Sequence, residues 1–124
     1  METFKKSERL NNKSSITDLF KCGRGITWSS LSLIWVRSNN SDSLTLQVMI
    51  SVPKKNIKSA VKRNLIRRRI NEAFRLRKDS LYTNLELMNK KLKCAIIYQS
   101  KEIDSYNSIE KKINLLLDRL LKEI

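Results

Sequence analysis

The chain has 124 residues and a mass of 14.6 kDa, enough for a single hydrophobic core, so we expect one domain over residues 1–124. Its 26 Lys and Arg residues outnumber 12 Asp and Glu residues, and the formal net charge of +14 indicates a negatively charged partner: nucleic acid, a membrane surface or an acidic protein. Histidine is absent, which excludes His-based catalytic triads and zinc sites that need His. Cys22 and Cys94 fit no metal spacing, so we expect free thiols. No apolar run suits a membrane span or a signal peptide, so we expect a cytoplasmic protein without a membrane partner.

The first part of the chain predicts one helix and two strands. Residues 7–22 carry apolar side chains at helical spacing, and Gly23 and Gly25 are expected to stop that helix and form a turn with positive φ. Residues 31–36 and 44–52 alternate between apolar and polar side chains, which is typical of strands. The polar loop between them is short enough for an antiparallel hairpin.

The second part predicts two helices and one strand. A basic helix should begin at about Ser59 and fade near residues 79–82, and residues 83–92 should form a connection. Residues 94–98 form a continuous apolar run, which predicts a strand buried on both faces, and residues 105–123 predict the last helix. The order α-β-β-α-β-α indicates an α+β domain with a mixed, mostly antiparallel sheet packed with helices. General statistics make the β-α-β crossover right-handed.

Positive charge is concentrated in residues 54–78, which contain eleven Lys or Arg residues and one acid, Glu72. Such crowding destabilises a fold by self-repulsion, whereas a polyanion offsets it because every phosphate that is neutralised releases counterions. Apolar positions share one face of the helix and should lie in the core: Ile66, Ile70, Ala73 and Phe74. The candidate nucleic-acid contacts are Lys54, Lys55, Lys58, Lys62, Arg63, Asn64, Arg67, Arg68 and Arg69. The alternative is a solvated helix face with a few ion pairs.

Several short motifs follow one another in a fixed order. They are Leu31-Ser32-Leu33-Ile34-Trp35-Val36, Ser51-Val52-Pro53-Lys54-Lys55, Ala60-Val61-Lys62-Arg63-Asn64, Ile66-Arg67-Arg68 and Glu72-Ala73-Phe74-Arg75. In this order, and over nearly the whole chain, they resemble the protein subunit of bacterial ribonuclease P. Three features depart from that pattern: the loop before Ala60 lacks the glycine that is often found there, and two positions carry other residues. Leu65 stands where the family has the last Arg of an Arg-Asn-Arg triplet, and Asn71 stands where Arg is common.

The resemblance implies a function, a partner and a division of labour. The holoenzyme would cleave precursor tRNA endonucleolytically to leave the mature 5′ end. The active site and its magnesium ions would belong to the catalytic RNA, so no catalytic residue, bound cofactor or obligate protein partner is expected on this chain. The protein would bind the catalytic RNA through the basic helix and hold the 5′ leader in a cleft lined by Phe20 and Trp35, although either ring could instead be core. The resemblance also implies a left-handed crossover.

Three other functions are weighed. A structural RNA-binding protein of ribosomal type has the same composition, but the motif order fits it less well. A protein-only nuclease would need carboxylates gathered on a metal, whereas the aspartates are scattered: Asp18, Asp42, Asp79, Asp104 and Asp118. A DNA-binding helix-turn-helix would need a partner helix beside the basic one, and strands flank it instead.

Overall fold

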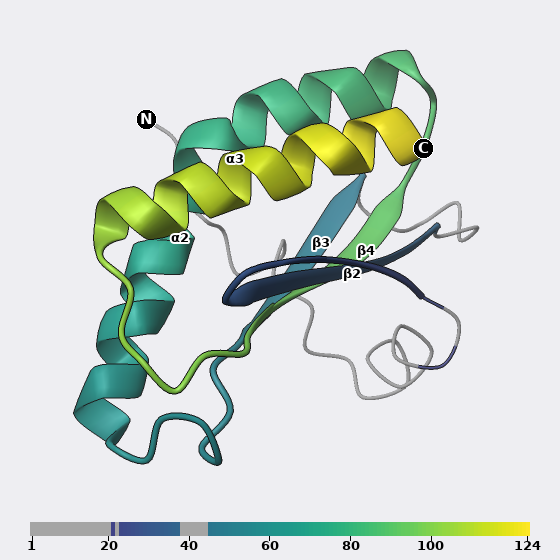
Figure 1. Cartoon of the computed structure of the whole chain (residues 1–124). Helices are drawn as coiled ribbons and strands as arrows, with labels where there is room; N and C mark the ends of the chain where they lie inside the picture. The colour runs from purple at the N-terminus through teal and green to yellow at the C-terminus, as the bar shows by residue number, and fades with distance from the viewer. Residues whose placement is uncertain (1–20, 22, 38–44) are drawn as a thin grey trace.

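The computed structural model describes residue 21, residues 23–37 and residues 45–124 (Figure 1). The elements are β1 (Arg24–Trp28), β2 (Leu31–Arg37), β3 (Leu46–Ser51), α2 (Ala60–Leu87), β4 (Leu92–Tyr98) and α3 (Tyr106–Glu123). The strands form one four-stranded sheet in the order β1-β2-β4-β3. Both α2 and α3 cover the same face of this sheet, side by side with each other (Figure 1). The helix predicted over residues 7–22 lies outside the described residues, apart from Lys21.

The strand β1 was not predicted from the sequence. Gly25 lies inside it, and no glycine among the described residues has a positive φ, so the predicted glycine turn is wrong. The β-branched and aromatic side chains that follow Gly25 favour an extended backbone, and Ile26 is buried in the core. The turn lies further along, where Ser29 with φ 56° joins β1 to β2 in an antiparallel hairpin.

The predicted hairpin between residues 31–36 and 44–52 is also wrong, because β4 lies between those two strands. Strand β2 pairs with β4 in antiparallel register, and β3 pairs with β4 in parallel register. Five of the seven residues of β4 are buried, and a strand buried on both faces is most stable in the middle of a sheet. The parallel β3-α2-β4 unit is therefore confirmed, and the hand of its crossover stays a prediction.

Helix α2 is longer than its sequence pattern suggested. Ser59 caps its start by accepting a hydrogen bond from the backbone N–H of Lys62. Residues 83–92 were expected to form a connection, but Leu81 and Leu85 are buried and keep the helix packed on the core up to Leu87. Asn89, with φ 55°, then turns the chain toward β4. The last helix begins after Ser105, as predicted.

One main core fills the space between the sheet and the two helices. It includes the predicted apolar stripe of α2, and the largest fully buried side chains in it are Tyr98 and Phe74. On the other face of the sheet Ala95 is buried, so the centre of β4 has apolar contacts on both faces, as predicted. Cys94 is a free thiol, and burial raises its pKa to about 12, which leaves it unreactive at neutral pH. None of the described helices is long and apolar enough to cross a membrane.

Candidate nucleic-acid interface

The positively charged residues lie on the loop between β3 and α2 and on the first half of α2. Val52 and Ile57 anchor this loop in the core, and the backbone N–H groups of Asn56 and Ile57 donate to the carbonyl of Pro53 at 3.1 and 3.2 Å. With its apolar side chains turned inward, the loop exposes its lysines to solvent. The loop is thus a compact turn that presents positive charge at the start of the helix.

Helix α2 has a buried apolar side and an exposed basic side. Ile66 and Ile70 are fully buried, and the predicted stripe through Ala73 and Phe74 is confirmed. Between these positions the helix turns basic side chains outward. Among the predicted contacts, five are exposed and have side chains that form no hydrogen bond or ion pair with any described residue: Lys54, Lys55, Lys58, Lys62 and Arg68. The charges of these five side chains are therefore not compensated within the described part of the protein.

Two other predicted contacts form hydrogen bonds within the protein. Arg63 donates from Nη1 to the carbonyl oxygens of Ile57 at 3.0 Å and Lys58 at 2.8 Å, so it holds the preceding loop against the helix. Arg69 donates from Nη1 to the carbonyl of Asp104 at 2.6 Å, which holds the loop between β4 and α3. Both side chains are half-buried. Their guanidinium groups therefore position backbone, a role that the sequence does not reveal.

The remaining predicted contacts pair with each other. Arg67 donates from Nη1 to Oδ1 of Asn64 at 2.8 Å on the exposed face of the helix. Glu72 accepts two hydrogen bonds from Arg75, at 2.6 and 3.0 Å, and the hydrogen bond from Arg75 lowers the pKa of that carboxyl. The only acid of this segment is thus neutralised by its neighbour and leaves the charge of the preceding residues uncompensated.

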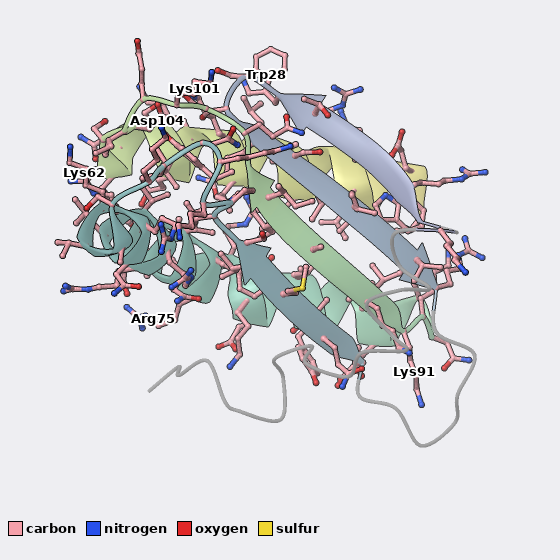
Figure 2. All side chains as sticks on the ribbon, turned by 90° about the horizontal axis from the view of Figure 1, so that it is seen from below. Trp28, Lys62, Arg75, Lys91, Lys101 and Asp104 are labelled. Carbon is pink, nitrogen blue, oxygen red and sulfur yellow. The ribbon has the colours of Figure 1, made fainter. Side chains whose placement is uncertain are left out.

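The loop of residues 99–105 contributes a cation that the sequence analysis missed. Lys101 is exposed and lies beside the start of α2, where it lines a hollow of about 290 Å³ together with Lys58, Lys62 and Ile103. Figure 2 shows Lys62, Lys101 and Asp104 on the same side of the molecule. A single lysine in a loop carries no sequence signal, and only the fold brings it to the basic helix.

A polar network fixes the same loop. The hydroxyl of Tyr98 accepts the N–H of Asp104 at 3.0 Å and donates to the carbonyl of Glu102. The Asp104 carboxylate accepts from Lys112 at 2.7 Å and from Ser30. Burial alone would raise the pKa of Asp104, but the hydrogen bonds from Lys112 and Ser30 and the charge of Lys112 outweigh it and lower that pKa. The loop is therefore tied to β4, to the β1–β2 turn and to α3.

Comparisons with known proteins agree with this arrangement. The family model described as Ribonuclease P matches residues 4–121. The chain belongs to the ribonuclease P protein family. The Ribonuclease P protein component of Porphyromonas gingivalis ATCC 33277 is 28% identical over 93% of this chain and 84% of the relative. That of Syntrophus aciditrophicus is 33% identical over 69% of each chain. The RNase P protein structure from Staphylococcus aureus has a TM-score of 0.73 at 21% identity and covers 91% of this chain and 94% of the other, which shows the same fold.

The predicted leader cleft had two lining residues, Phe20 and Trp35, and the structure describes one of them. Trp35 is only 4% exposed and packs in the main core with Leu31 and Leu33. This burial favours the core alternative, because alternation along β2 turns this position toward the helices. Phe20 lies outside the described residues. The exposed tryptophan is Trp28 at the end of β1, with 47% of its surface accessible, and the sequence analysis did not consider it (Figure 2).

Proposed function

We propose that this protein, as the protein component of the ribonuclease P endoribonuclease, binds the catalytic RNA and the 5′ leader of precursor tRNA. The observation that supports this proposal is the group of five exposed cations between residues 54 and 68 whose side chains have no partner among the described residues. Each cation that neutralises a phosphate releases counterions, so this surface gains free energy only against a polyanion. Because membership in the family already implies an RNA partner, the catalytic RNA is the natural occupant of this surface.

Within this proposal the RNA carries out the hydrolysis and the protein contributes binding and orientation. The chain has no histidine to act as a general base. Among the described acids, the Glu72, Asp104 and Asp118 carboxylates each accept a hydrogen bond from a cation: Arg75, Lys112 and Arg77. Carboxylates engaged in this way are poorly suited to gather around magnesium, so the proposal assigns the magnesium ions to the RNA. It also assigns the protein to the cytoplasm, where precursor tRNA is processed in bacteria.

Reconstitution tests the proposal. The purified protein, a bacterial ribonuclease P RNA and precursor tRNA are combined at low magnesium, and cleavage at the mature 5′ end is measured with and without the protein. We expect no cleavage by the protein alone and clear stimulation of the RNA. Cleavage by the protein without RNA, or an RNA whose rate is unchanged by the protein, would contradict the proposal.

A charge variant tests the surface itself. Lys62→Ala with Arg68→Ala removes two exposed cations, so the log–log salt slope of binding to the catalytic RNA should fall by about 1.4–1.8. The matched control is Lys111→Ala with Lys122→Ala, which removes the same charge from exposed positions of α3. Equal slopes for the two variants would show that net charge alone, and not this surface, drives binding.

A further inference from the structure

We propose that the loop of residues 99–105 forms the second wall of a groove that holds the phosphodiester backbone of the catalytic RNA, with Lys101 as a direct RNA contact. This inference rests on the proposed function and extends its surface from one segment of the chain to two. It also makes Arg69 a positioning residue, which acts on the RNA through the loop that carries Lys101.

The first wall of the groove is the start of α2 and the turn before it. Lys58 and Lys62 both line the hollow and are exposed, and their side chains form no hydrogen bond or ion pair with any described residue. Arg63 fixes the carbonyl groups of Ile57 and Lys58, so this wall is held in one position relative to the helix. A preorganised wall loses little conformational entropy when a ligand binds.

The second wall is held as firmly. Tyr98, at the end of β4, bonds the backbone of both Glu102 and Asp104 through its hydroxyl, and Asn56 bonds the carbonyl of Tyr98 at 3.3 Å. Arg69 reaches across from α2 to the Asp104 carbonyl. Lys101 lies within the segment that these bonds fix, so its backbone is placed opposite Lys58 and Lys62 before any RNA binds.

The charges around the groove favour an anion. Three lysines line it and no carboxylate does. The nearby Asp104 carboxylate is occupied by Lys112 and Ser30, so it does not compensate the groove lysines. Ile103 adds an exposed apolar side chain to the lining, which suits contact with a ribose or a base. With a volume of about 290 Å³, the hollow is at the small end of ligand sites and accepts part of one strand.

The test measures binding of the full-length protein to ribonuclease P RNA as a function of salt. Lys101→Ala should lower the log–log slope by about 0.7–0.9, which between 1 M and 0.15 M salt corresponds to a roughly four- to sixfold loss of affinity at the lower concentration. Lys101→Arg should retain the slope, because the charge is kept. The control Lys111→Ala, an exposed lysine on α3, should leave slope and affinity unchanged.

The outcomes separate this proposal from the one on which it rests. If the unmodified protein fails to bind the RNA, the proposed function is wrong. If it binds and Lys101→Ala behaves like Lys111→Ala, the proposed function stands and the groove is refuted. A loss confined to precursor tRNA binding by the assembled holoenzyme, with binding of the catalytic RNA intact, would also refute it, because the occupant would then be the substrate.

A double-mutant cycle tests the role of Arg69. Arg69→Ala should weaken RNA binding in the original protein and have a clearly smaller effect when Lys101→Ala is already present, since the loop then has no cation to place. If Arg69 only stabilised the fold, Arg69→Ala would lower the melting temperature equally in both backgrounds, and its effect on RNA affinity would not become smaller when Lys101→Ala is present. Equal effects of Arg69→Ala on affinity in both backgrounds would overturn the positioning role.

Discussion

Removing the charge of Asp104 should destabilise the whole domain. The side chains of Asp104 and Lys112 are only 17% and 15% exposed, and the carboxylate and ammonium groups lie 2.7 Å apart. The pair is therefore shielded from water far better than a surface ion pair, which is worth at most about 1 kcal/mol. Asp104→Asn keeps an oxygen for the Ser30 hydroxyl but replaces the hydrogen bond between two charges with a weaker one. A hydrogen bond to a charged group contributes about 1.5–3 kcal/mol, so we expect a loss of about 2 kcal/mol in the free energy of unfolding.

Urea and thermal unfolding followed by circular dichroism measure this loss. For a domain of this size, about 2 kcal/mol corresponds to a melting temperature lower by roughly 6–12 °C. The pKa of Asp104 is lowered in the folded state, so its contribution is complete above its ordinary value of 3.8 and is lost as the pH falls through the folded pKa. The difference between the original protein and Asp104→Asn should therefore be constant at pH 6–8 and shrink toward pH 3. A difference that is absent at pH 7, or that persists unchanged at pH 3, would refute the reasoning.

Three further predictions concern single side chains. Trp35→Ala should lower the free energy of unfolding by about 3–5 kcal/mol, because it empties a core site; a fully stable variant with weakened leader binding would restore the cleft assignment. Arg63→Ala should cost about 1–2 kcal/mol in urea unfolding through its two carbonyl bonds, whereas exposed Arg68→Ala should stay within about 0.5 kcal/mol; equal costs would show that Arg63 is not a structural anchor. Asn89→Ala should destabilise by about 1 kcal/mol in the same assay, since alanine tolerates its positive φ poorly; no change would mean that the turn relaxes.

Periodicity predicted most elements because burial of one face imposes a repeat on the sequence. The stripe through Ile66, Ile70 and Phe74 located α2, and the alternation in β2 and β3 located two strands. The choice of which strands pair imposes no such repeat on the sequence. Neighbours in sequence were expected to pair, but Leu33 of β2 lies opposite Ile96 of β4, far along the chain. Strand β1 was missed because Gly25 was interpreted as part of a turn.

The candidate site could be proposed from residue type but not from geometry. Charge density located the basic segment, since no stable fold needs so many cations in one place. Which of these cations stay free depends on parts of the chain that are distant in sequence. Arg69 is engaged because it donates to the carbonyl of Asp104, and Lys101 joins the surface because the fold brings its loop beside the start of α2. Trp35 shows the same limit, because alternation placed it with Leu31 and Leu33 without telling which face of the sheet they occupy.

The central position of β4 sets the order in which this protein can form. Strands β2 and β3 have no direct contact in the sheet, and both wait for residues 92–98 to fold back between them. Contacts between such distant segments slow folding, because a long loop must close before any of them is gained. While the chain is being synthesised, α2 therefore emerges with its positive charge complete but without the middle of the sheet on which it packs. RNA binding that needs the finished surface should accordingly follow synthesis of β4 rather than of α2.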